Sequence, residues 1–135
     1  MKIVGYNYAA VHIIMHIVIA FILYLSVEQD FSWDFAKLAV IAAGTAVVDL
    51  DHIFLWKEKG IKGYLELRSI EEYGKPRSYK FHNLMVFCGF FGGSLLLVVN
   101  DYYLIGLFFA AALLHMVWDL FEDLVIFRMG YGHWI

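Results

Sequence analysis

The chain has 135 residues, of which 62% are hydrophobic and 17% are charged, and it contains one proline. This composition is too apolar for an average soluble domain and places the chain among membrane proteins. The single cysteine, Cys88, excludes an intramolecular disulfide and a cysteine-based metal site. The formal net charge is -3, and we expect no nucleic-acid partner.

Four apolar runs are long enough to supply the roughly 20 residues that a membrane-spanning helix needs. We therefore predict an all-α integral membrane protein, a single domain over residues 1–135 with four transmembrane helices in a bundle. The soluble alternative, a buried four-helix core, would require polar outer helix faces, which these runs lack. The predicted spans are 6–27, 33–56, 81–99 and 102–127.

The basic residues are unevenly distributed, because seven of the ten lie in the long connection at residues 57–80. The short connections at 28–34 and 100–101 contain no Lys or Arg. The positive-inside rule therefore places the long connection and both termini in the cytoplasm, for a protein of the plasma or inner membrane. The first run lacks a small-residue cleavage site after it, so we expect it to remain in the mature protein.

The first two predicted spans carry ionisable residues near their cytoplasmic ends. His12 and His16 are spaced i, i+4 and share one helix face. His12 lies nearer the cytoplasm and is the better candidate ligand, and His16 is an additional candidate. The second span reaches Asp49, Asp51 and His52. On a regular helix Asp51 points away from Asp49, so two carboxylates at one site require the helix to end or distort there.

The connection at residues 57–80 is too long for a simple turn. A short amphipathic helix over 64–73 is expected to lie on the membrane surface. Arg77 and Lys80 are candidate binding residues for a negatively charged substrate, although such basic loops more often only set topology.

The third predicted span begins at His82. Because His82 lies at the membrane–water interface, an ordinary solvated imidazole is the alternative to a metal ligand. Gly89 and Gly93 follow on one face of this span. Such small-residue spacing predicts close helix packing, and it offers a contact for a homo-oligomer.

The fourth predicted span contains His115 and Asp119 one helical turn apart in an apolar setting. A carboxylate in this position either binds the same cation as the imidazole or orients the imidazole through its second nitrogen. Glu122 and Asp123 lie closer to the cytoplasm, and we interpret them as partly solvated.

The spans alternate in direction, so the histidines and carboxylates of all four fall in the cytoplasmic leaflet. A charged group at a helix centre costs about 2.5 to 3.5 kcal/mol on insertion scales and needs compensation. Lys37, the only basic residue well inside a predicted span, belongs to the opposite end. A bound cation, imidazolium partners or protonated carboxylates remain as explanations.

Mixed nitrogen and oxygen donors suit zinc best, with manganese or iron as alternatives and one or two ions. The predicted metal ligands are His12, Asp49, His82, His115 and Asp119.

The order of these residues resembles the predicted membrane-bound metal-dependent hydrolases of the LexA-regulated inner-membrane family. That family shows an early His, then Pro-Asp-x-Asp-His, His-Arg-x-x-Thr-His and His-x-x-x-Asp segments beside membrane helices. The chain departs from this pattern at Val48, Arg77 and Phe81, which replace the proline, the first histidine of the third segment and the threonine. The matching residues are His12, Asp49, Asp51, His52, His82, His115 and Asp119.

The resemblance implies a hydrolase in which the metal activates a water to attack an ester or phosphodiester. Membrane lipid is the expected partner, and a phospholipid or another phosphoester at the cytoplasmic headgroup level is the expected substrate. Asp51 or His52 would take and return the proton. Two alternatives remain open: a non-catalytic metal- or proton-binding protein or small transporter subunit, and a haem or diiron redox protein.

Overall fold

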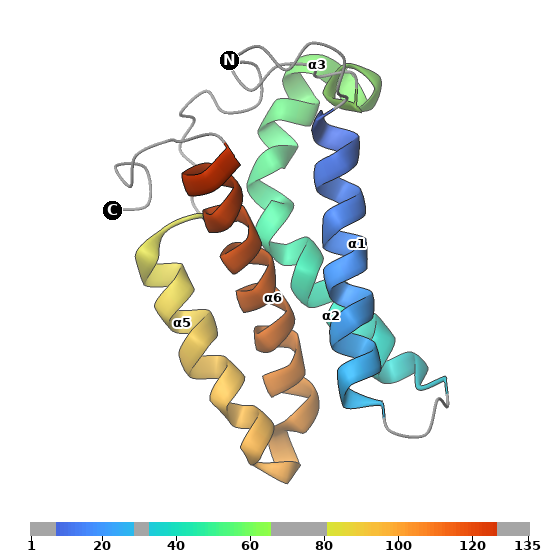
Figure 1. The fold of residues 1–135 in the computed structure, drawn as a ribbon, viewed down its shortest axis with the longest axis vertical. Helices are drawn as coiled ribbons and strands as arrows, with labels where there is room; N and C mark the ends of the chain where they lie inside the picture. The colour runs from blue at the N-terminus through green and yellow to red at the C-terminus, as the bar shows by residue number, and fades with distance from the viewer. Residues whose placement is uncertain (1–7, 29–32, 66–80, 127–135) are drawn as a thin grey trace.

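The computed structural model describes residues 8–28, 33–65 and 81–126, and these residues form helices and no strand. Figure 1 shows the helices as long rods, with α2 and α3 following each other in one rod. The all-helical prediction is thus confirmed for this part of the chain. The helices are α1 (Tyr8–Val27), α2 (Phe35–Val48), α3 (Ile53–Leu65), α5 (Leu84–Ser94) and α6 (Tyr103–Phe121).

Short tighter or wider helical turns join or extend these rods. A 3₁₀ turn, η1 (Asp49–His52), links α2 to α3, and a second, η2 (Leu95–Val98), continues α5. A third, η3 (Asn100–Tyr102), leads into α6, and a π-helical turn, η4 (Glu122–Ile126), continues it. Two stretches, Ala10–Val27 and Asn100–Val125, are long and apolar enough to cross a membrane, and the apolar helices Phe35–Val48 and Leu84–Val98 are shorter.

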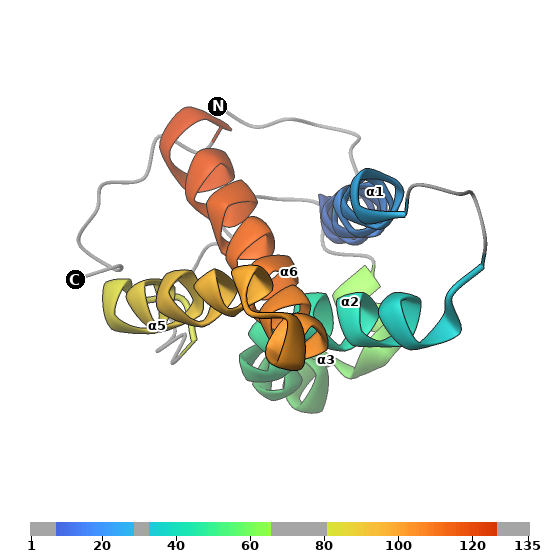
Figure 2. The ribbon, with the colours of Figure 1, turned by 90° about the horizontal axis from the view of Figure 1, so that it is seen from below.

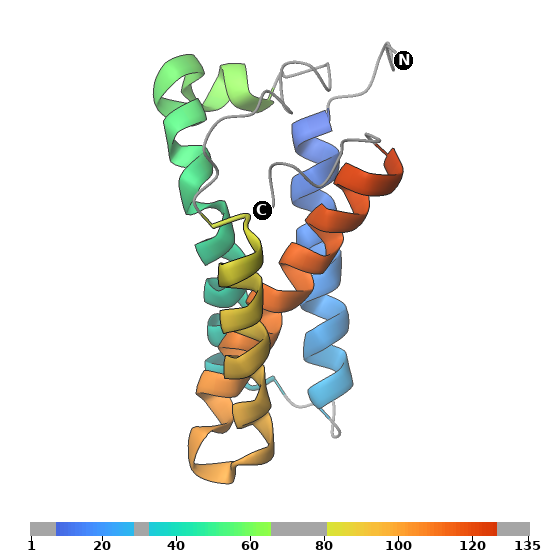
Figure 3. The same ribbon diagram turned by 90° about the vertical axis from the view of Figure 1, so that its left-hand side faces the viewer.

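The beginning of the basic connection is helical, which corrects the prediction that the helix stops near Trp56. Helix α3 continues to Leu65 and bends at Gly60, whose φ of 69° favours glycine. Figure 3 shows this bend at the upper end of the rod formed by α2 and α3. Most of the predicted amphipathic helix over 64–73 lies outside the described residues.

Helix α6 packs against both α2 and α5, as Figure 2 shows from below. The contact with α2 is close because Gly44 faces the backbone of α6: a Cβ at this position would overlap the Phe108 carbonyl oxygen and lie 2.9 Å from Ala111 Cβ. Ile41, Leu107 and Ala111 are buried beside this contact. Gly44 therefore allows the close approach of α2 and α6.

The two glycines of α5 differ in what they face. A Cβ at Gly93 would lie 2.5 Å from the Phe109 ring, so Gly93 is used for packing within the chain. A Cβ at Gly89 would meet no atom of the described residues within 4 Å. A homo-oligomer contact through the face of α5 that carries Gly89 stays a prediction.

Lys37 lies at the far end of the bundle from the histidines and is engaged there. Its Nζ is 2.9 Å from Glu28 Oε2 and 3.6 Å from Asp34 Oδ2. Asp34 caps α2 by accepting hydrogen bonds from the backbone N–H groups of Ala36 and Lys37. Lys37 therefore neutralises acids at its own end of the bundle.

Burial in this chain is unlike that of a soluble bundle. Among the described residues, eight hydrophobic and eight polar or charged residues are buried, while large apolar side chains on α1, α5 and α6 are exposed. Ile17 and Met85, for example, are 62% and 87% exposed. An apolar exterior around a polar interior is an arrangement that suits lipid as the surrounding solvent.

Candidate metal centre

Helix α1 supplies two imidazoles from consecutive turns of one face. His12 and His16 are 2% and 6% exposed, and their Nε2 atoms lie 2.9 Å apart. Two nitrogen lone pairs at this distance repel each other unless a proton or a cation lies between them. Two nitrogens bound to one ion at about 2.1 Å would be about 3.0 Å apart around an octahedral ion and about 3.4 Å apart around a tetrahedral one, so small shifts let both imidazoles bind one ion.

The junction between α2 and α3 supplies a carboxylate and a third imidazole. Helix α2 ends at Val48, and the 3₁₀ turn η1 places Asp49 Oδ1 3.2 Å from His52 Nδ1. Helix α2 therefore ends directly before Asp49. A shared site for Asp49 and Asp51 was predicted to require the helix to end or distort at this place. The side chain of Asp51 is outside the described part of the structure, so its predicted role stays a prediction.

His82 precedes α5 rather than lying inside it. Asn83 caps that helix by accepting a hydrogen bond from the Val86 backbone N–H at 3.0 Å, which fixes the turn that carries His82. The His82 ring stacks on His52, with ring centroids 5.4 Å apart. His82 is buried, and its Nε2 lies 3.0 Å from Asp119 Oδ2.

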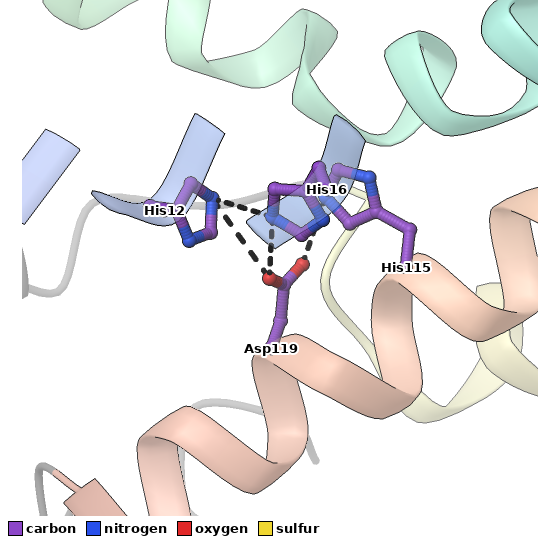
Figure 4. A group of neighbouring side chains, drawn as sticks. All are labelled: His12, His16, His115 and Asp119. Atoms are coloured by element: carbon purple, nitrogen blue, oxygen red, sulfur yellow. Dashed lines mark hydrogen bonds and ion pairs between the residues drawn. The ribbon is translucent and has the colours of Figure 1, made fainter. Parts of the chain in front are cut away.

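Helix α6 supplies the residues at the centre of the cluster. His115 and Asp119 are 0% and 5% exposed, and His115 Nε2 lies 3.1 Å from Asp119 Oδ2. The other carboxylate oxygen, Oδ1, lies 3.3 Å from His16 Nε2 and 3.9 Å from His12 Nε2. Figure 4 shows Asp119 between the two imidazoles of α1 and that of His115.

Several of these buried atoms lack hydrogen-bond partners within the described residues. His115 Nε2 and Asp49 Oδ1 lie 3.4 Å apart but do not form a hydrogen bond, and Asp119 Oδ1 is likewise unsatisfied. Buried polar groups are almost always hydrogen-bonded, so each exception needs an explanation. A cation supplies one for Asp49 Oδ1, His115 Nε2 and Asp119 Oδ1, which face the cluster, because metal ligands converge on a point between them rather than pair with each other. The donor set therefore fits a metal ion. The unsatisfied atoms are His16 Nδ1, Asp49 Oδ1, His115 Nδ1, His115 Nε2 and Asp119 Oδ1.

Glu122 is part of this centre, which corrects its interpretation as a partly solvated residue. It is 2% exposed; His12 Nδ1 donates a hydrogen bond to its Oε2 at 2.9 Å and Trp118 Nε1 donates one to its Oε1 at 2.6 Å. A carboxylate that accepts from Nδ1 fixes the ring and directs the Nε2 lone pair of His12 into the cluster. Glu122 lies three residues after Asp119 and seven after His115, so helix periodicity places it on the same face.

Replacing Glu122 by glutamine should weaken metal binding without removing a donor atom. Loss of an outer carboxylate partner of a ligating histidine typically costs 10- to 100-fold in metal affinity, and we expect a reduction of about that size. Competition with a chromophoric chelator measures it. The matched control is Asp123→Asn, the neighbouring, less buried acid, which should leave the affinity within about twofold. Equal affinity for the Glu122→Gln protein and the unaltered protein would exclude the orienting role.

The structure thus brings together all five predicted ligands, with His16 and His52. Within this cluster, three sets of residues have donor atoms that all lie within 4.8 Å of one another. Arg77 and Lys80, the predicted substrate-binding residues, lie outside the described residues. The sets are His12, His16, His115 and Asp119; His12, Asp49 and His52; and Asp49, His82 and His115.

Comparisons with protein-family models, curated protein sequences and solved structures give no match to this chain. The geometry of the cluster is therefore the basis for assigning a function.

Proposed function

We propose that this chain is a membrane-embedded, metal-dependent hydrolase that acts on an ester or phosphodiester at the cytoplasmic membrane interface. The observation that carries the proposal is the convergence of donor atoms from α1, η1 and α6 on one small volume, in which Asp49 Oδ1, His115 Nε2 and Asp119 Oδ1 are buried and unsatisfied. Buried imidazoles and carboxylates of this kind mark functional sites more often than structural ones within membrane segments.

The membrane setting is supported by the distribution of apolar side chains. The two longest apolar stretches are long and apolar enough to cross a membrane, and the exposed Ile, Leu, Val and Phe side chains of α1, α5 and α6 face outward. We propose four spans, with the shorter α2 and α5 extended by η1 with α3 and by η2. The histidine cluster then lies toward the ends that the positive-inside rule assigns to the cytoplasm.

The donor chemistry supports a divalent transition metal, with zinc first and manganese or iron as alternatives. Imidazole nitrogens outnumber carboxylates in the cluster, whereas magnesium and calcium prefer oxygen donors. Cys88, the one cysteine, is exposed on α5. The order of the donor residues also supports a relationship to the predicted membrane-bound metal-dependent hydrolases that the sequence resembles.

The proposed hydrolysis consumes only the substrate and water. A bound divalent cation supplies Lewis acidity and lowers the pKa of a water in the site. His52, buried at the edge of the cluster, is placed to accept the proton of that water and return it to the leaving oxygen, and Asp51 is the second candidate for this role. With a phosphodiester, the water oxygen forms one P–O bond while another breaks, giving a phosphomonoester and an alcohol. Arg77 and Lys80 are proposed to hold the substrate phosphate.

The experiment is phosphorus NMR of mixed micelles that contain an anionic phospholipid and the purified full chain, with zinc or manganese and then with a chelator. We expect slow release of a phosphomonoester that stops on chelation and in the Asp49→Ala variant. The control is Thr45→Val, which should leave turnover unchanged, because among the described residues Thr45 bonds only to carbonyls of its own helix. Turnover that survives both chelation and Asp49→Ala would contradict the mechanism, as would a folded, metal-loaded protein that hydrolyses no phosphoester or ester.

Metal affinity should fall steeply with acid. Histidine binds a metal only as the neutral imidazole, and protons compete below its ordinary titration range near pH 6.5. Each proton displaced on binding weakens the apparent affinity by up to about tenfold per pH unit. Zinc titrations between pH 5 and pH 8 measure this, and we expect more than one proton to be displaced. An affinity that does not change over this range would indicate a site without histidine ligands.

A further inference from the structure

We propose that the cluster holds two cations and that the Asp119 carboxylate bridges them, one oxygen to each ion. This inference rests on the proposed metal-dependent function and deepens it. Apart from His52, six buried or partly buried side chains turn a donor atom toward the same volume, and Asp119 contributes both of its oxygens, which makes seven donor atoms. One zinc ion takes four ligands and an octahedral ion takes six. The donors are therefore too many for one ion.

The shortest distances associate two imidazoles with each oxygen of Asp119. Oδ1 faces α1, with His16 Nε2 at 3.3 Å and His12 Nε2 at 3.9 Å. Oδ2 faces the other side, with His82 Nε2 at 3.0 Å and His115 Nε2 at 3.1 Å. Two ligands of one ion bound at about 2.0–2.2 Å are at most about 4.4 Å apart, and every one of these separations is shorter.

Asp49 completes the second set. Its Oδ1 lies 3.4 Å from His115 Nε2 and 3.9 Å from His12 Nε2 of the first set, and Asp49, His82 and His115 form one of the groups whose donor atoms are mutually close. The first subsite then comprises His12, His16 and Asp119 Oδ1. The second comprises His82, His115, Asp49 Oδ1 and Asp119 Oδ2.

The charge of the cluster accommodates two ions. Asp49, Asp119 and Glu122 bring three carboxylates to the cluster, and the one lysine of α2, Lys37, is paired with Glu28 at the far end. A single divalent cation leaves this part of the bundle with one uncompensated negative charge. Two divalent cations exceed the charge of the three carboxylates by one, which a bound hydroxide or a substrate phosphate offsets.

The test is titration of the metal-free full chain in detergent with manganese(II), read by calorimetry and by electron paramagnetic resonance. We expect two equivalents per chain and, at full loading, a spectrum of two exchange-coupled ions, because a carboxylate bridge couples their spins. His16→Ala and His82→Ala each remove a donor from one subsite and should each bind one equivalent with an uncoupled spectrum. Thr45→Val is the control and should keep two. Circular dichroism and size-exclusion chromatography establish that each variant is folded.

The outcomes separate this inference from the proposed function. One equivalent in the unaltered protein, or two that are not coupled, would overturn the bridged pair, while a hydrolase with a single ion would still stand. No bound manganese or zinc in the folded, unaltered protein would overturn both. The stoichiometry and spectrum of the unaltered chain decide the matter even where a variant does not fold.

Discussion

Replacing Asp119 by alanine should abolish tight metal binding, the largest effect expected of any single substitution in this chain. Its two oxygens approach imidazoles from α1, from α6 and from the segment before α5. Loss of an outer partner of a ligand already costs 10- to 100-fold, so loss of this central carboxylate should cost more than about 100-fold. Metal retained after dialysis against a weak chelator, measured by plasma mass spectrometry, reports the change.

The matched control is Asp101→Ala, because Asp101 is an exposed acid in η3 at the other end of α6. It should retain the metal content and affinity of the unaltered protein. A folded Asp119→Ala protein with unchanged affinity would show that the carboxylate only pairs with protonated imidazoles.

Replacing Gly44 by alanine should destabilise the bundle at the contact between α2 and α6. A single methyl group there would overlap the Phe108 carbonyl oxygen and crowd Ala111. The Phe108 oxygen is a backbone atom and Ala111 Cβ is bonded directly to the backbone, so neither can move aside alone. The two helices must therefore separate, and overpacking of this kind typically costs about 1–3 kcal/mol. These helices carry Asp49 on one side and His115 with Asp119 on the other, so metal affinity should fall as well. Thermal unfolding in detergent, followed by circular dichroism, measures the loss.

Gly89→Ala is the matched control, since a methyl group at Gly89 meets no atom of the described residues within 4 Å. We expect its unfolding temperature to equal or slightly exceed that of the unaltered protein, because alanine is the better helix former. If Gly44→Ala were as stable as Gly89→Ala, the close approach of α2 and α6 would be incorrect.

The helical class and the convergence of the site residues were predictable because both follow from simple geometry. Apolar runs of spanning length predict helices. Because consecutive helices alternate in direction, the start of one helix lies at the same depth as the end of the next. That reasoning placed His12, Asp49, His82 and Asp119 at one level, and the structure places them within one cluster. The i, i+4 spacing of His115 and Asp119 likewise predicted the contact now seen at 3.1 Å.

The remaining features depend on which helix faces meet, and the sequence alone does not reveal this. Glu122 lies near the end of its apolar run beside Asp123, so it looked solvated, yet the approach of His12 and Trp118 buries it. Periodicity from Asp119 was the available signal. In the same way, Gly60 and the neighbouring lysines indicated a loop, whereas the glycine bends α3 and the helix continues to Leu65.

X-ray absorption spectroscopy of the zinc-loaded full chain in detergent tests the central claim most directly, because it reports which atoms surround the ion. The account predicts a shell of nitrogen and oxygen ligands at about 2.0–2.1 Å with the outer scattering of several imidazole rings, and a weaker imidazole contribution in the His115→Ala variant. A shell of oxygen atoms alone, as for a hydrated ion, or one that includes sulfur from Cys88, would contradict it.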